Sequence, residues 1–287
     1  MLGQQLVNGI TLGSTYALIA IGYTLVLGVL KKLNIAHGEL FMVGAFAGIA
    51  LAALGAPLPV NLAAAFAVAG LVAVAVERVC FHPLRHASFL SPMLTTIAFG
   101  ILLQNVATQM FGSEPSRFPH SAEPQQFAIG SLSISAVQIA ILATAFTLMF
   151  GLDLLVRRTR WGIALRATSD DPETAAQHGV HPSRITITTF FVSGALAGVA
   201  GVLTTLVYSQ VTPLIGIRQG LIGMVAIVIG GLGNLRGAMI GGLALGLIET
   251  MNDAYFYAGY RDFVIFSVFF AFLIFKPEGL FPAQAGR

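Results

Sequence analysis

Charged side chains are scarce in this sequence. Asp, Glu, Lys and Arg make up 9% of the 287 residues, whereas hydrophobic residues make up 56%. A soluble globular domain carries about 25% charged residues, so a soluble domain is excluded as the main body of the chain. At roughly 20 residues per crossing, this length allows about eight or nine membrane-spanning helices joined by short loops.

Cysteine and catalytic motifs are also missing. The single cysteine, Cys80, excludes an internal disulfide. The sequence contains no G-x-x-x-x-G-K-[ST] nucleotide-binding loop, no H-E-x-x-H and no G-x-S-x-G. We therefore do not expect an enzyme, a metal site or a cofactor bound by this chain. The net charge of +3 is expected to reflect basic loop residues rather than binding of nucleic acid.

Long apolar runs are what the sequence has in abundance. They predict an all-α, polytopic membrane protein with a single transmembrane domain over residues 1–287 and about eight or nine spanning helices. Glycine-rich stretches near 28–48 and 210–246 predict broken or re-entrant helices, and their likeness to each other suggests inverted repeats. The runs fall at about 5–30, 38–54, 60–79, 92–111, 136–156, 185–208, 219–233, 237–256 and 262–275.

The basic residues predict the orientation. Twelve of the 15 lie on one side of this arrangement, which the positive-inside rule makes cytoplasmic. The N-terminus is then outside and the C-terminus is cytoplasmic. The longest loops are an external one at about 112–135 and a cytoplasmic one at about 157–184. The cytoplasmic basic residues are Lys31, Lys32, Arg78, Arg85, Arg157, Arg158, Arg160, Arg166, Arg184, Arg236, Lys276 and Arg287, and the external ones are Arg117, Arg218 and Arg261.

Glycine pairs recur at helical spacing among the 32 glycines. Such small-xxx-small pairs let helix backbones approach closely in lipid. They favour a tightly packed core within one chain, and dimerisation through one such face is the alternative. The pairs are Gly9/Gly13, Gly44/Gly48, Gly194/Gly198, Gly237/Gly241 and Gly242/Gly246.

The cytoplasmic loop at 157–184 predicts a helix of about two turns. Asp171 precedes Pro172, which suits a first helical position, and Glu173 adds negative charge to the first turn. Gly179 ends the helix. A helix this short is marginal in water, so it needs something on which to dock. An ordinary solvated loop is the alternative.

Around this helix the sequence resembles a known family. Glu173-Thr-Ala-Ala176 followed by Gly179 resembles the "EAA…G" coupling loop of bacterial ABC-importer permeases, with Thr174 in place of the central alanine. Strings along nearly the whole chain are similar, in order, to the branched-chain amino-acid permease family (LivH/LivM type), and closer to LivH. They are Asn34-Ile-Ala-His-Gly-Glu39, Pro83-Leu-Arg85, Arg166 to Val180, Phe190 to Gly201, Gly230-Gly-Leu-Gly-Asn234 and Lys276 to Pro282.

The resemblance implies a complex in the bacterial inner (plasma) membrane. Two permease subunits, this chain and a LivM-like one, form the path for branched-chain or related small polar amino acids. Two ABC ATPase subunits hydrolyse ATP, and an extracytoplasmic substrate-binding protein delivers the substrate. Coupling to the ATPase would pass through the 165–182 loop, and an ion-coupled secondary transporter or a channel is the alternative. The expected coupling residues are Asp171, Glu173, Ala175, Ala176 and Gly179.

Polar side chains at membrane depth are candidates for the substrate pathway because they are costly in lipid. For Gln104 and Asn105, hydrogen bonding between helices is favoured over lining the pathway. The candidates are Asn34, His37, Glu39, Gln104, Asn105 and Thr212.

Two interpretations stay open for Glu39. It lines the pathway and accepts a substrate ammonium, or it is structural and pairs with Lys31 or Lys32, while Asn34 caps the next helix. Glu249, within a predicted span, is expected to bond to a neighbouring helix or an arginine.

Overall fold

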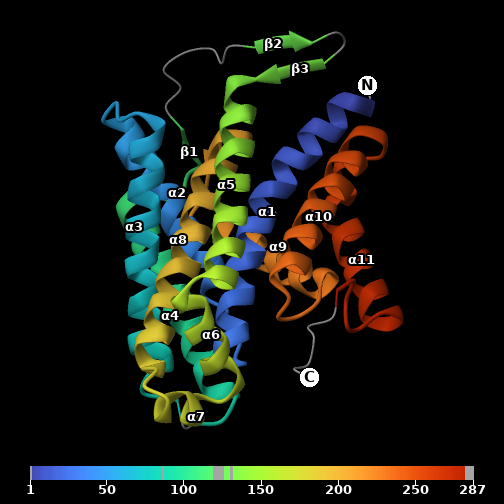
Figure 1. Ribbon diagram of the computed structural model, residues 1–287. Coiled ribbons are helices and arrows are strands. Elements are labelled where there is room, and N and C mark those ends of the chain that lie inside the picture. The colour runs from blue at the N-terminus through green and yellow to red at the C-terminus, as the bar shows by residue number, and fades with distance from the viewer. Residues whose placement is uncertain (1, 86, 119–125, 130–131, 282–287) are drawn as a thin grey trace.

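Long helices packed side by side form the structure (Figure 1). The computed structural model describes residues 2–85, 87–118, 126–129 and 132–281. The prediction of an all-α fold is confirmed, since the described strands are two short pairs. The helices are α1 (Leu2–Leu30), α2 (His37–Ala53), α3 (Leu58–Val76), α4 (Leu90–Phe111), α5 (Ala136–Arg158), α6 (Arg160–Asp170), α7 (Pro172–Gln177), α8 (Pro182–Tyr208), α9 (Ile215–Gly230), α10 (Leu235–Tyr255) and α11 (Arg261–Phe275).

The predicted apolar runs all overlap helices of the structure. Among the described residues, 6 helices are long and apolar enough to cross a membrane, or up to 7 if the bent pair α9 and α10 forms one span. This is fewer than the eight or nine predicted, because α2 has only 17 residues and α9 meets α10 at a bend of 119°. The polytopic fold is confirmed, and the bend is a broken helix of the predicted kind.

Helix α1 lies at the centre of the bundle, with every residue from Thr11 to Val26 buried. Glycines let α10 lie directly against it. A Cβ added at Gly246 would meet the backbone of Gly13, and one at Gly242 would meet the backbone of Ala17. Both contacts lie within one chain, and neither Gly242 nor Gly246 has room for a side chain.

Helix α8 packs between α2 and α3 in the same way. A Cβ at Gly44 of α2 would meet the backbone of Gly198, and one at Gly198 would lie 2.5 Å from the carbonyl oxygen of Ala65 in α3. The other predicted pairs also face helices of the same chain. The glycine pairs therefore pack the core of the monomer, as the favoured interpretation predicted.

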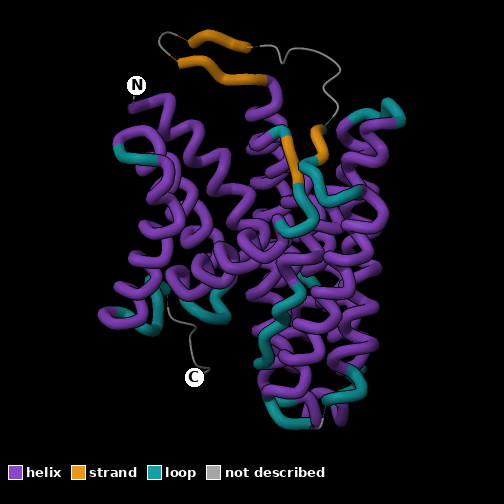
Figure 2. The backbone as a smooth tube through the Cα atoms, turned by 180° about the vertical axis from the view of Figure 1, so that it is seen from behind, coloured by secondary structure: helices purple, strands orange, loops and turns teal. Residues whose placement is uncertain are grey.

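Short strands lie at the end of the molecule that carries the N-terminus (Figures 1 and 2). β1 (Ser116–Arg117) pairs with β4 (Gln210–Val211), and β2 (Gln126–Ile129) pairs with β3 (Leu132–Ser135), both antiparallel. These strands were not predicted, because the Pro- and Ser-rich 112–135 segment reads as a loop. Parts of that loop, 119–125 and 130–131, lie outside the described residues.

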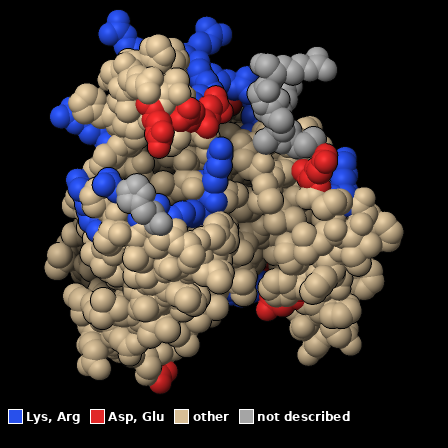
Figure 3. Space-filling view, turned by 90° about the horizontal axis from the view of Figure 1, so that it is seen from below, with Lys and Arg blue, Asp and Glu red and all other residues tan. Residues whose placement is uncertain are grey.

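The opposite end of the molecule carries α6 and α7 (Figure 1). Seen from below, this end shows many Lys and Arg side chains with acidic ones among them (Figure 3). Arg157 and Arg158 stand in the last turn of α5, directly before α6. Two of the residues on which the sequence prediction relied, Pro282 and Arg287, lie outside the described residues.

Candidate functional site: the α6–α7 clamp and the Glu39 recess

Helix α7 is the short helix predicted in the cytoplasmic loop. Asp171 is its N-cap, and its Oδ1 accepts hydrogen bonds from the backbone N–H groups of Glu173 at 2.9 Å and Thr174 at 3.2 Å. The Thr174 hydroxyl and these N–H groups hold the pKa of the Asp171 carboxyl below its usual range. Gly179 follows the helix with φ +82°, a left-handed conformation that suits glycine. Both predicted ends are confirmed.

Most of α7 faces solvent. Ala175 is buried at 4% exposure, whereas Asp171, Glu173, Ala176 and Gly179 are exposed. Ala175 also accepts the backbone N–H of Val180 through its carbonyl at 3.1 Å. Of the five predicted coupling residues, Ala175 therefore anchors α7 and the other four lie on its accessible surface.

Helix α6 was not predicted from the sequence. The hydroxyl of Thr159 caps it by accepting the N–H of Gly162 at 3.2 Å. Gly162, Leu165 and Thr168 are buried and stand three residues apart. This cap and this spacing are the signals that would have found it.

Helix α6 is tied to three spanning helices. Trp161 Nε1 donates to the Thr188 hydroxyl of α8 at 2.8 Å, and the Ser169 hydroxyl donates to the carbonyl of Gly28 in α1. Gly162 lies so close to the backbone of Val156 in α5 that a side chain there would not fit. We call α6 and α7 together the clamp, because α6 is held by α1, α5 and α8 and connects the exposed α7 to them.

A cavity of about 250 Å³ lies where α1, α2, α4 and α9 meet. We call it the Glu39 recess. Close contacts of Gly38 with Gly216 and Gly220 bring α2 and α9 together beside it. The two glycine-rich segments with similar sequence therefore touch, although their origin as inverted repeats stays a prediction. The recess is lined by Tyr23, Ile35, Ala36, Glu39, Thr96, Ile97, Gly100, Ile101, Gln104, Gly216, Ile217, Gly220, Leu221 and Met224.

Glu39 is nearly enclosed, at 5% exposure. Its Oε1 accepts a hydrogen bond from Gln104 Nε2 at 2.8 Å. Its Oε2 has no hydrogen-bond partner among the described residues and faces Gly216, where an added Cβ would meet it. The interhelical hydrogen bond predicted for Gln104 is thus present, and it holds Glu39 in the recess.

In the described part of the chain, two details of the structural interpretation of Glu39 are wrong, namely its ion pair with a lysine and the capping of α2 by Asn34. Lys32 Nζ lies 3.5 Å from the carbonyl oxygens of Leu84 and Arg85, and no ion pair joins Glu39 to a lysine in the described part of the chain. The N-cap of α2 is Ala36 and has no side-chain cap, so Asn34 does not cap this helix. The six-residue break between α1 and α2 turns Asn34 inward instead, where it is 1% exposed.

The remaining candidates lie at different places. His37 is buried, with its ring centroid 4.2 Å from that of Tyr23. Asn105 is exposed on α4 and is not part of the recess lining. The interhelical hydrogen bond predicted for it is wrong among the described residues, because its amide donates to the carbonyl of Ile101 in the same helix at 2.8 Å. Thr212 is half-buried in the break before α9. The structure therefore brings Glu39 and Gln104 together and leaves Asn105 and Thr212 apart from them.

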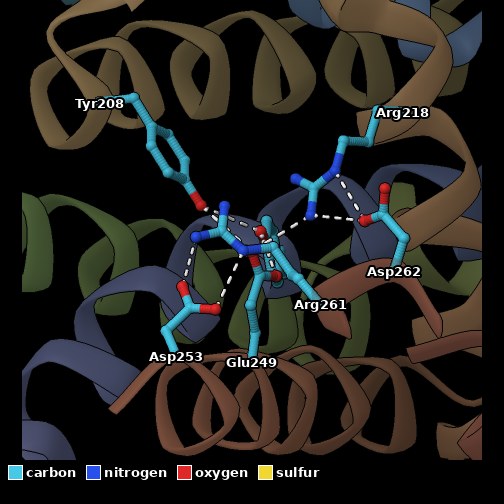
Figure 4. Close-up of polar contacts among 7 residues, drawn as sticks. Tyr208, Arg218, Glu249, Asp253, Arg261 and Asp262 are labelled. Atoms are coloured by element: carbon cyan, nitrogen blue, oxygen red, sulfur yellow. Dashed lines mark hydrogen bonds and ion pairs between the residues drawn. The ribbon is translucent and has the colours of Figure 1, made fainter. Parts of the chain in front are cut away.

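A second charged cluster surrounds Glu249 of α10 (Figure 4). The Glu249 carboxylate, with none of its side chain exposed, accepts from the Tyr16 hydroxyl at 2.7 Å. It also pairs with Arg218 at 3.2 Å and with Arg261 at 3.1 Å. The predicted bond from Glu249 to a neighbouring helix or an arginine is confirmed. The outer partners are Asp262, which pairs with Arg218, and Asp253, which pairs with Arg261.

The fold and these polar groups define a class. In the described part of the chain, a bundle of apolar helices with a buried central helix, a recess between helices and a clamp at one end is the architecture of a multi-pass membrane protein. The chain belongs to the family described as branched-chain amino acid transport system / permease component, whose profile matches residues 5–273.

Curated relatives agree with this assignment. The chain is 40% identical to the high-affinity branched-chain amino acid transport system permease protein BraD of Pseudomonas aeruginosa, over 96% of this chain and 94% of BraD. It is 37% identical to LivH of Escherichia coli over the same shares, and 23% identical to LivM of Escherichia coli over 98% of this chain and 71% of LivM. The predicted closeness to LivH is confirmed. A search of solved structures finds no match.

Proposed function

We propose that this chain is the membrane-spanning subunit of an ATP-driven importer of branched-chain amino acids in the bacterial inner membrane. The observation that carries the proposal is the clamp. A two-turn helix that exposes Glu173 and Ala176 has too little buried surface to be stable alone. Helix α6 connects it to α1, α5 and α8. This connection would transmit movement of a bound ATPase to the spanning helices.

The proposed substrate class is taken from the names of similar proteins. BraD and LivH are named as permease proteins of high-affinity branched-chain amino acid transport systems. They match this chain from near its start to near its end. An extracytoplasmic binding protein would deliver the amino acid at the end of the molecule opposite the clamp.

The solute path would run along the face of α4 and α9, against a second permease chain. The recess opens between exposed side chains, including Ile101 of α4 at 52% exposure and Ile217 of α9 at 50%. Asn105 is exposed on α4 within the predicted span, where a polar amide is costly against lipid. LivH and LivM of Escherichia coli carry the same system name, which supports two permease chains in one transporter.

The clamp would face the cytoplasm, and the C-terminus with it. The basic residues at the end of α5 and in α6 favour this orientation. ATP would be bound and hydrolysed by two ABC ATPase subunits and not by this chain.

Charge reversal on α7 tests the proposal. In Glu173→Lys, the exposed face of α7 changes sign while the cap at Asp171 and the anchor at Ala175 remain. We expect the chain to insert normally, to lose co-purification of the ATPase by about 10-fold or more, and to lose ATP-linked leucine uptake in proportion.

Glu114→Lys is the matched control. Glu114 is also exposed, but it follows α4 at the opposite end of the molecule. This variant should retain the ATPase fully. Equal retention of the ATPase by both variants would show that α7 is not the docking element.

A further inference from the structure

The Glu39 recess has two chemically different parts. One part holds the Glu39 carboxylate, the Gln104 amide and Tyr23. The wall is apolar and contains Ile97, Ile101, Ile217, Leu221 and Met224. A volume of about 250 Å³ equals that of about eight water molecules at about 30 Å³ each, which suits a solute of about ten non-hydrogen atoms or fewer.

We propose that Glu39 Oε2 binds the ammonium group of the transported amino acid and that the apolar wall receives its branched side chain. This inference rests on the proposed function, since it assigns a chemical role to one point on the solute path. It makes Glu39 the residue that distinguishes an amino acid from an equally apolar solute without a positive charge.

The free carboxylate oxygen is the first observation. Oε1 is already bonded to Gln104, whereas Oε2 is buried against Gly216 without a partner in the described part of the chain, and Glu39 is one of the residues that line the recess. A buried acceptor that stays unbonded costs about 1–3 kcal/mol, and more if it is charged. Such an oxygen is expected where a donor arrives during function. An ammonium supplies three N–H donors and a positive charge.

The charge balance of the recess is the second observation. Its lining contains Glu39 but neither Lys nor Arg. Among the described residues, no group of three His, Cys, Asp or Glu side chains is arranged to hold a metal ion. A cationic group on the solute itself therefore complements this carboxylate better than a bound metal does.

The start of α9 provides a place for the other charge of the amino acid. Gly216 lies in the first turn of α9 and against Glu39, and Leu214 caps this helix without a side-chain hydrogen bond. The N-terminus of a helix carries partial positive charge and attracts carboxylates. The start of α9, which lines the recess at Gly216 and Ile217, therefore attracts the carboxylate of an amino acid whose ammonium lies at Glu39.

Competition for photolabelling tests the assignment. The assembled transporter in nanodiscs, without added binding protein, is labelled with photo-leucine, and labelled residues are located by mass spectrometry. Unlabelled leucine competes with the label, and so does 2-hydroxy-4-methylpentanoate, which has a hydroxyl in place of the ammonium. We expect label on the α4 and α9 walls and about 10-fold stronger competition by leucine, the effect of one charge-assisted contact.

Two variants complete the experiment. Glu39→Gln keeps the shape of the side chain and its contact with Gln104 but removes the charge, so leucine and the hydroxy acid should compete within about 2-fold of each other. Glu77→Gln removes another buried carboxylate, which lies next to Arg78 at 3.6 Å and outside the recess. This control should keep the 10-fold preference.

Two results would overturn the assignment. One is a preference for leucine that Glu39→Gln leaves unchanged, and the other is label that never reaches the recess walls. Either result can occur in a transporter whose uptake still depends on ATP and on Glu173, so failure of this inference is separable from failure of the proposed function.

Discussion

Glu249 carries a carboxylate into the interior of the bundle, where an unpaired charge is costly. The cluster meets this cost by pairing Glu249 with Arg218 and Arg261 and by adding the Tyr16 hydroxyl. These partners come from α1, α9 and α11. A single carboxylate on α10 therefore joins the central helix α1 to α9 and α11.

Neutralising this carboxylate should destabilise the protein. In Glu249→Gln, two arginines lose their shared partner, so we expect a loss on the order of 3 kcal/mol. The melting temperature of the detergent-solubilised chain should fall by about 5–10 °C. Asp262→Asn is the control, because Asp262 is 59% exposed and its pair with Arg218 contributes about 1 kcal/mol or less. Equal melting temperatures for the two variants would contradict this role of Glu249.

At the scale of helices, glycine sets the distances within the bundle. Gly198 lies where α8 passes between α2 and α3, and Gly44 on α2 touches its backbone. In lipid there is little hydrophobic force between helices, so close backbone contact supplies much of the packing. The close contacts at these two glycines therefore fix the position of α2, and with it the position of Glu39 in the first turn of α2.

The same substitution at two glycines separates packing from helix propensity. Gly198→Ala adds a methyl group against Ala69 and Ala65, and we expect overpacking to cost about 1–3 kcal/mol. Gly151→Ala on α5 meets nothing within 4 Å, so it should be neutral or slightly stabilising. Thermal unfolding of both variants in detergent measures the difference. Equal stability would mean that the α2–α3–α8 contact is looser than the structure indicates.

The clamp shows which elements can be predicted from sequence. Helix α7 was predicted because Asp171, Pro172 and Gly179 are strong local signals of where a helix starts and ends. Helix α6 was missed because its arginines resemble a solvated positive-inside loop, although Leu165 and Thr168 are buried. Local signals thus identified the helix that faces solvent and missed the one that packs against the core.

At the scale of the whole molecule, apolar runs predicted where the helices lie but not how many cross a membrane alone. The short α2 and the bend of 119° between α9 and α10 depend on contacts between helices, which hydropathy does not contain. The recess is a similar case. Glu39 and Gln104 are 65 residues apart and meet only in the folded chain, whereas Asn105, next in sequence to Gln104, lies on the exposed side of α4.

The central claim is that this chain provides the path and another chain provides the energy. The direct measurement is uptake of radiolabelled leucine into liposomes that contain this chain alone, or this chain with its companion permease, ATPase and binding protein. We predict no concentrative uptake by the chain alone under any ion gradient, and uptake by the full complex only when ATP is hydrolysed. Concentrative uptake by the isolated chain would contradict the account.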